Sequence, residues 1–337
     1  MWGGSRRPVG RCGPVRARQR KLQAPGGPGG YVSRYRNLGL FFVLAAVWGS
    51  AFVAIKAGLS EFPPVLFAAL RYDVAGVVML GYAASRANQW RPADRRQWAT
   101  VLVGALLLIA AYHAFLFVGE QSTTSAAAAV VVSLSPVLTT LFARAFLPDE
   151  RLTVLGLVGS GLGLAGVAAV AHPDPAQLFA RDVVANLLVF CAALSFALGS
   201  VLTTWLDAGL EIETMEAWSM VGGALLMHGV SLALGESLAA VTWSPRGLVA
   251  LAYLALGASA FGFLIYFDLL DRLGPVEINL VSYVAPLIAA VVGFLFLGEV
   301  VDAWTAVGFC LIFAGFVLIK RRAIRQEVPR VRALLGG

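Results

Sequence analysis

Ten apolar stretches, each close to the length of a membrane-spanning helix, constrain the fold of this chain more than any other feature. A helix needs roughly 20 mostly apolar residues to cross a bilayer. Lipid cannot satisfy backbone polar groups, so a spanning segment is a helix or a strand of a closed barrel. Barrel strands have about 10 residues of alternating polarity, which these longer runs lack. The predicted helices are 38–59, 63–84, 98–119, 124–147, 152–171, 183–206, 213–235, 246–270, 275–298 and 303–320.

The composition agrees with an all-α integral membrane protein. The 337 residues are 59% hydrophobic and 13% charged, whereas an ordinary soluble domain is about 45–50% apolar and about 25% charged. The three cysteines and three histidines are scattered, without a C-x-x-C pair or a cluster. We therefore expect no disulfide framework, no metal site and no cofactor.

Residues 1–36 differ from the rest of the chain. They contain nine basic residues, no acidic residue and many Gly and Pro residues, so we expect a disordered basic tail that buries no core. No apolar h-region precedes residue 38, which argues against a cleaved secretory signal. Alternatively, translation starts near residue 31, so it stays open whether residues 1–30 belong to the mature protein.

The basic residues predict the orientation in the membrane. With the N-terminus inside, 22 of the 26 Lys and Arg residues lie in cytoplasmic segments, and only Arg181 and Arg246 lie in outer loops. This asymmetry predicts a multi-pass protein of the cell membrane with both termini in the cytoplasm. One predicted cytoplasmic loop has acids and no bases, at Asp207, Glu211, Glu213 and Glu216. The net charge of +7 fits basic residues at lipid edges better than a nucleic-acid partner.

The two halves of the chain resemble each other at a shift near 150 residues. S-L-S-P ends at Pro136 and Y-V-A-P ends at Pro286, and an acidic residue follows each proline, Glu150 and Glu299. Further matching pairs are Gly49-Ser50 with Gly199-Ser200, Phe117 with Phe267, Gly159 with Gly308, and Gly166 with Gly315. Each half contains five predicted spans. Since five is odd, the second copy enters from the opposite face, which predicts two inverted five-helix repeats, an architecture of secondary transporters.

One stretch formally matches a nucleotide-binding motif. Gly161 to Gly166 reads G-x-G-x-x-G, but a dinucleotide-binding turn needs a preceding strand and a following acidic residue. Here the motif lies inside an apolar span. We interpret Gly159 and Gly163 as a G-x-x-x-G pair that lets helix backbones approach closely, although membrane helices also tolerate glycine in general.

Three stretches and one single residue carry a resemblance to a known family. They are WGSAFVAIKAGL (48–59), the lone Arg71 of the second span, SLSPVLTTLFARAFLPDERLTVLGLVGSGLGLAGV (133–167), and SYVAPLIAAVVGFLFLGEVVDAWTAVGFCLIFAGFVLI (282–319). Together they resemble the two EamA domains of the drug/metabolite transporter superfamily. Pro148 stands where the second copy has Gly298, and one residue is added, a departure that affects a loop.

The resemblance implies domain boundaries and a cavity. It implies a first EamA domain at 37–172 and a second at 180–320, five helices each, between the basic tails 1–36 and 321–337. It also implies a central cavity between the halves. Relatives in this family export amino acids or other metabolites, or exchange sugar phosphates or nucleotide sugars.

Ionisable residues within the spans are the first candidates for substrate contact, because a charge in the bilayer core is costly and usually faces a cavity or a partner. Arg71 could anchor an anionic group, with Asp73 as a proton carrier, or either could form a structural ion pair with another span. Lys56 could contribute to the cavity or extend to the interface. His113 could carry a proton or could simply be hydrogen-bonded between helices.

Aromatic and neutral polar residues complete the candidate set. Trp48 and Tyr112 could line an aromatic wall, and Asn279, Ser282 and Tyr283 could donate hydrogen bonds to a ligand. Pro136 and Pro286, at equivalent positions, predict helix bends near the cavity, because proline removes a backbone hydrogen bond. We interpret Glu150 and Glu299 as helix-terminal charges.

The leading hypothesis is a secondary transporter that moves a small metabolite across the cell membrane by alternating access, in the direction of export. Its partners are then the substrate and the lipid bilayer; a coupling proton or ion and a homodimer stay open. No Walker motif lies outside the spans, which argues against direct use of ATP. A passive channel or membrane scaffold is the alternative. An intramembrane enzyme would need a clustered nucleophile and base, which the sequence lacks.

Overall fold

The computed structural model describes residues 29–146, 154–171, 180–206, 208–273, 278 and 280–335, and within them it contains helices and connecting loops but no strand. Two compact units divide the chain, Met1–Leu40 and Phe41–Gly337. Of the first unit, residues 29–40 are described, and they form the beginning of α2. Everything below concerns the second unit. Pro148, Glu150, Asp207 and Asn279 lie outside the described residues.

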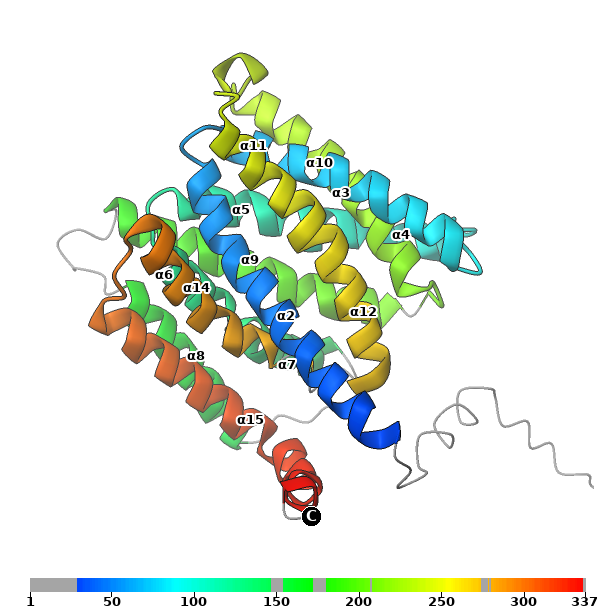
Figure 1. Ribbon diagram of the computed structural model, residues 1–337, viewed down its shortest axis with the longest axis vertical. Helices are drawn as coiled ribbons and strands as arrows, with labels where there is room; N and C mark the ends of the chain where they lie inside the picture. The colour runs from blue at the N-terminus through cyan, green and yellow to red at the C-terminus, as the bar shows by residue number, and fades with distance from the viewer. Residues whose placement is uncertain are drawn as a thin grey trace, which may run out of the picture. The chain divides into compact units, whose positions relative to one another are not determined.

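The helices follow the predicted apolar runs (Figure 1). Their bounds in the first half are α2 Gly29–Gly58, α3 Pro64–Arg86, α4 Arg95–Val103, η1 Gly104–Ala111, α5 Tyr112–Glu120, α6 Ser125–Val132, α7 Ser135–Phe146 and α8 Val154–Ala171. In the second half they are α9 Arg181–Leu206, α10 Ile212–Ala233, η2 Leu238–Ala240, α11 Pro245–Ala252, η3 Tyr253–Phe261, α12 Gly262–Leu273, α14 Val281–Leu297 and α15 Ala303–Leu335.

Six helical segments are long and apolar enough to cross a membrane, and three shorter apolar helices accompany them. The six are 36–58, 64–86, 95–120, 125–146, 181–206 and 245–270; the three are 155–171, 281–297 and 303–319. The one remaining predicted run, 213–235, corresponds to α10, which carries Glu213, Glu216 and His228 among its apolar residues. The all-α membrane class is therefore confirmed, while the exact number of ten spans stays a prediction.

Counterpart helices of the two halves pack against each other in opposite directions. The carboxylate of Glu236, just after α10, accepts hydrogen bonds from the amides of Val65 and Leu66 at the start of α3. At the other end, Glu211 before α10 accepts from the amide and side chain of Asn88 after α3. The two helices therefore run antiparallel. This is the arrangement that an inverted repeat requires.

The glycines of α8 pack against α15, with which α8 lies side by side (Figure 1). A Cβ on Gly159 would lie 2.6 Å from the carbonyl oxygen of Gly315, and one on Gly166 would lie 2.7 Å from that of Gly308. Gly159 and Gly166 are the repeat counterparts of Gly308 and Gly315. The contact is therefore self-complementary, because Gly159 packs against the counterpart of Gly166 and Gly166 packs against the counterpart of Gly159. Gly163 also packs closely, since a Cβ there would lie 2.5 Å from the Leu134 side chain.

Both halves contain a π-helical segment at the same place in the repeat. η1 begins at Gly104 and η3 at Tyr253, which is the shift of 149 residues seen in the glycine pairs. π-helical turns are rare and are frequent at functional sites. The sequence analysis predicted neither segment.

Pro136 and Pro286 lie in two further counterpart helices. Pro136 is the second residue of α7, and a turn at Ser133 and Leu134 separates α7 from α6. Because Pro136 has no N–H, it cannot donate a hydrogen bond to the carbonyl oxygen of Val132. The Ser135 hydroxyl donates to that oxygen instead, at 2.7 Å. Pro286 lies inside α14.

The packing of α8 on α15 generates a prediction. Gly166→Ala should lower the melting temperature of the purified protein, because the new methyl group would meet a backbone carbonyl, and overpacking costs about 1–3 kcal/mol. Gly161→Ala, on the same helix, is the matched control, because nothing lies within 4 Å of its Cβ position. The control should leave the melting temperature unchanged or raise it, since Ala is favoured over Gly in helices by about 1 kcal/mol. Equal melting temperatures would show that close approach does not hold the two helices together.

Candidate functional site

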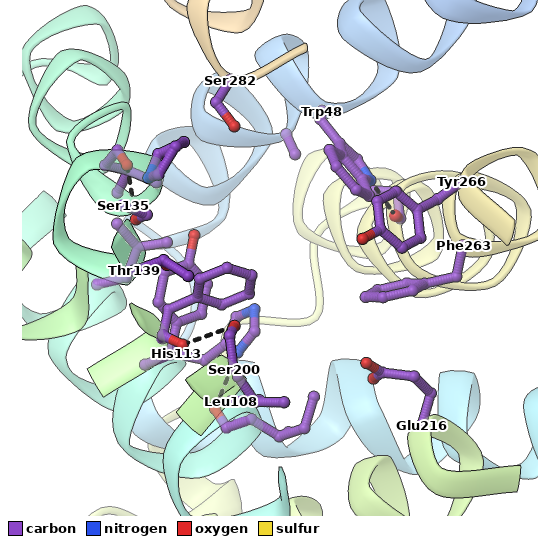
Figure 2. Close-up of a pocket in the computed structure, with 18 of the residues that line it drawn as sticks. Trp48, Leu108, His113, Ser135, Thr139, Ser200, Glu216, Phe263, Tyr266 and Ser282 are labelled. Atoms are coloured by element: carbon purple, nitrogen blue, oxygen red, sulfur yellow. Dashed lines mark hydrogen bonds between the residues drawn. The ribbon is translucent and has the colours of Figure 1, made fainter. Parts of the chain in front are cut away.

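A cavity of about 520 Å³ lies among the helices of both halves. Side chains from α2, α3, η1, α5, α6 and α7 of the first half and from α9, α10, η3, α12 and α14 of the second half line it. Most of this lining is apolar, and a small number of polar groups interrupt it (Figure 2). A concave, largely apolar pocket with few polar groups is typical of a small-molecule site.

Arg71 is a buried cation in the cavity wall. Its side chain on α3 is 6% exposed. Its Nε donates a hydrogen bond of 2.9 Å to the Ser259 hydroxyl, and its guanidinium carbon lies 5.1 Å from the centre of the Tyr72 ring. Within the described part of the chain, no carboxylate forms an ion pair with Arg71. Ser259 belongs to the π-helical segment η3, so the irregular turn positions the group that orients Arg71.

His113 and Tyr72 form a buried hydrogen-bonded pair beside Arg71. Nδ1 of His113 lies 2.8 Å from the Ile109 carbonyl oxygen, which can only accept, so Nδ1 carries the proton in a neutral ring. Nε2 then accepts from the Tyr72 hydroxyl at 2.8 Å. Ile109 belongs to η1, so this second π-helical segment also positions a side chain of the cavity.

Aromatic side chains form much of the remaining wall. The Trp48 indole Nε1 donates to the Ala258 carbonyl at 3.1 Å, which orients the ring toward Tyr266 and Phe263, with ring centres 5.5 and 5.9 Å away. Tyr112 packs against Phe196, with ring centres 5.5 Å apart. Flat aromatic walls suit an apolar or cationic ligand body.

Neutral polar groups lie on the walls between the aromatic side chains. Ser135, Thr139, Ser200 and Ser282 line the cavity, and Figure 2 shows Ser135 and Thr139 on the wall across from Phe263. Pro136 lines it as well. The break between α6 and α7 therefore lies at the cavity, in the position that the sequence predicted for a helix bend.

Four candidates do not line the cavity in this structure. Asp73 pairs with His228 on α10 at 2.8 Å, where both side chains are about one-third exposed or more. Lys56 donates to the backbone carbonyls of Glu120, Gln121 and Thr123. Tyr283 packs against two phenylalanines of α15, Phe313 and Phe316. Pro286 is buried in α14 and does not line the cavity.

The sequence analysis missed Glu216. It assigned this residue to an acidic cytoplasmic loop, whereas the structure places it in the first turns of α10 with its side chain in the cavity wall. The residue is 8% exposed. A signal was present, since Glu216 directly precedes a long apolar run. Because Glu216 is far in sequence from the other polar residues of the cavity, the sequence did not reveal that they share one cavity.

One end of the cavity is closed by aromatic packing. Beyond His113, the ring of Phe117 contacts Phe67, which stacks on Phe62 with ring centres 4.7 Å apart. The Lys56 ammonium ties the end of α2 to the turn that follows α5 at the same end. The lining continues the other way, to Leu270 near the end of α12 and to the exposed Thr204 near the end of α9, so this is the open end of the cavity.

The region described by the structure contains no group of three or more His, Cys, Asp or Glu side chains that could hold a metal ion. The described part of the cavity lining contains one cation, one carboxylate, a His–Tyr pair and aromatic faces.

Comparison with known proteins identifies close relatives of the chain. The model of the EamA-like transporter family matches residues 37–171 and 183–321. The uncharacterized inner membrane transporter YedA of Escherichia coli strain K12 is 30% identical over 309 residues, which cover 90% of this chain and 98% of that protein. A probable terminal-alkyne amino-acid exporter of Streptantibioticus cattleyicolor is 30% identical over 83% of this chain and 92% of that protein.

A crystal structure shares the fold. Its TM-score is 0.61 at 24% identity, and the match covers 87% of this chain and 99% of that one. The uncharacterized transporter YvbV of Bacillus subtilis is 26% identical over 87% of this chain and 94% of that protein. These relatives are described as transporters rather than enzymes.

The cavity itself can be tested by chemical labelling. In a variant whose three cysteines, Cys12, Cys191 and Cys310, are replaced by serine, Ser282→Cys should react with a water-soluble maleimide, because Ser282 lines the cavity. Ala289→Cys on the same helix should stay unreacted until the protein unfolds, because Ala289 is fully buried in packing. Mass spectrometry of the purified protein measures both rates. Equal protection of the two cysteines would contradict a solvent-filled cavity at Ser282.

Proposed function

Because the chain belongs to the EamA-like transporter family, we propose that it is a secondary transporter that exports a small metabolite with an anionic group, an amino acid or a similar compound, by alternating access. Its homologues are membrane transporters, which supports a transport function for this chain. The substrate class, the direction and the mechanism are our proposal. A relative described as an amino-acid exporter supports the first two.

The observation that carries the substrate class is the state of Arg71. A guanidinium within a membrane is costly and needs a partner or water. Among the described residues its hydrogen-bond partner is a neutral hydroxyl, Ser259. An anionic substrate group would supply the missing opposite charge. Carboxylates and phosphates match the fork of a guanidinium in geometry.

The closed and open ends of the cavity support alternating access. The Phe67–Phe117 packing and the Lys56 contacts close one end, while the cavity reaches toward the other. Two inverted repeats can exchange conformations, so that the open and closed ends trade places. On this proposal the structure is one of the two states. The distribution of basic residues supports a cytoplasmic position for the open end, where an exported metabolite would enter.

A gradient must drive a secondary transporter, and we infer a proton or another ion. His113 is the candidate proton carrier in the cavity, because it titrates near neutral pH in water and lies between Tyr72 and the closed end. The pair of Asp73 and His228 is a second titratable group, outside the lining.

Arg71→Ala should weaken ligand binding. We expect that amino acids and carboxylates raise the melting temperature of the purified protein, and that the substitution weakens the apparent affinity about tenfold to a hundredfold. The physical reason is the loss of a hydrogen bond to a charged group, worth about 1.5–3 kcal/mol. Arg246→Ala, at the exposed start of α11, is the control and should change nothing. An undiminished shift in Arg71→Ala would remove Arg71 from the site.

The orientation has its own test. Fluorescent protein fused to either terminus should fluoresce, and alkaline phosphatase at either terminus should be inactive, because both termini are expected in the cytoplasm. Phosphatase fused after Gly235, between α10 and η2, should be active. Opposite results for the two termini would require an odd number of spans. They would exclude the paired five-helix arrangement.

A further inference from the structure

Glu216 is a buried carboxylate that no group of the described chain neutralises. It is 8% exposed, and its Oε2 has no hydrogen-bond partner among the described residues. No described cation forms an ion pair with it. Figure 2 shows its carboxylate pointing into the cavity. Arg71 has a hydroxyl to orient it, whereas Glu216 has nothing.

An unpaired buried carboxylate is destabilising. Removing a charged group from water costs several kcal/mol unless a partner repays it. Repacking the cavity wall with an apolar side chain would avoid this cost, so the carboxylate is best explained by a cation that arrives from outside the chain. The nearby walls indicate which kind of cation.

Aromatic rings lie beside the carboxylate. Phe263 and Tyr266 lie on the same side of the cavity as Glu216 (Figure 2), and Trp48 packs against both rings. Aromatic faces attract organic cations, most strongly protonated and quaternary amines. A carboxylate together with aromatic faces selects an ammonium group attached to an apolar body. A hydrated metal ion would prefer several oxygen ligands.

The position of Glu216 is distinct from that of Arg71. Gly76 of α3 faces Val221 of α10, since a Cβ on Gly76 would lie 3.2 Å from the Val221 nitrogen. Arg71 precedes Gly76 by five residues and Glu216 precedes Val221 by five. Because the helices are antiparallel, these steps add, and the two Cα atoms are separated along the helices by about 15 Å at a rise of 1.5 Å per residue.

This separation bears on whether Arg71 and Glu216 belong to one site or to two. The ammonium nitrogen and carboxylate carbon of an α-amino acid are joined through two bonds of about 1.5 Å each. Such a compact zwitterion spans only a small part of the separation between the two Cα atoms, which favours two sites over one. Glu216 lies nearer the open end, beside Met215 and Ile212 at the beginning of α10.

We propose that Glu216, with Trp48, Phe263 and Tyr266, forms a binding site for a protonated or quaternary amine, separate from Arg71 and nearer the open end of the cavity. Amine binding at this site does not depend on the proposed transport function, but the role of the site on the substrate path rests on it. A substrate with both charges contacts Glu216 first and Arg71 second. The site therefore selects substrates by their positive group before they reach the guanidinium.

Three probes with a common phenylalkyl body separate the two sites. Phenethylamine carries only the cation, 3-phenylpropanoate only the anion, and L-phenylalanine both. Isothermal titration calorimetry on the purified full-length chain in nanodiscs at pH 7 measures their affinities. The variants are Glu216→Gln, which keeps the shape of the side chain, Arg71→Gln, and the control Glu213→Gln. Glu213 is on the same helix and does not line the cavity.

We expect Glu216→Gln to weaken phenethylamine binding at least tenfold and to leave 3-phenylpropanoate unchanged. Arg71→Gln should do the reverse, and Glu213→Gln should alter neither. The amine site is overturned if the wild-type chain does not bind phenethylamine, or if Glu216→Gln binds it as tightly as the wild type does. It is also overturned if each of the two cavity variants weakens both single-charge probes equally, because that result indicates one compact site.

The outcome for the amine site is distinguishable from the outcome for the proposed function. If phenethylamine binds through Glu216 but no probe crosses the membrane of reconstituted vesicles, the transport proposal fails and the amine site stands. If L-phenylalanine is transported and Glu216→Gln alters neither its flux nor phenethylamine binding, the amine site fails alone. Melting curves of all variants identify any loss of folding.

Discussion

The two halves are held together by contacts that each repeat makes with its own inverted copy. Where α8 crosses α15, backbone approaches backbone at four glycines that the repeat relates in pairs. Where α3 packs on α10, a carboxylate beside each end of α10 accepts hydrogen bonds from the backbone at the facing end of α3. Within lipid there is little hydrophobic drive between helices, so close packing and buried hydrogen bonds have to provide the cohesion. The cavity is the space that these counterpart pairs leave among the remaining helices.

The polar groups of the cavity depend on departures from regular helix. Ser259 and Ile109, which orient Arg71 and His113, belong to the two π-helical segments, and Ser135 serves the carbonyl that Pro136 cannot. Irregular backbone at membrane depth is tolerated where it faces a cavity or is buried in protein. The π-helical segments, which lie in counterpart elements of the two halves, and the break at Pro136 therefore occur where the ligand space is.

The sequence predicted the membrane class, the inverted repeat and the packing role of the glycines, because these follow from the hydrophobic pattern and from spacing. It also brought Arg71, His113, Trp48 and Tyr112 forward as candidates, since rare polar or amphipathic residues in apolar spans are visible in one dimension. Pairings were not visible. Asp73 meets His228 across 155 positions, and Glu216 was hidden because its acidic neighbours resembled a loop. Whether a π-helical turn forms depends on tertiary packing that periodicity does not encode.

The repeat explains the scaffold, and the departures from it explain the chemistry. At the shift of 150 residues, Arg71 corresponds to Val221 and Glu216 corresponds to Leu66. Each of the two paired helices thus carries one cavity-lining charge that its counterpart replaces with an apolar residue. A symmetric scaffold supplies two equivalent conformations, but a symmetric set of charges would place like groups on both sides of the cavity and repel one another. Opposite charges on α3 and α10 instead lie at different levels of the cavity, which fits the proposed order in which a substrate with both charges meets Glu216 and then Arg71.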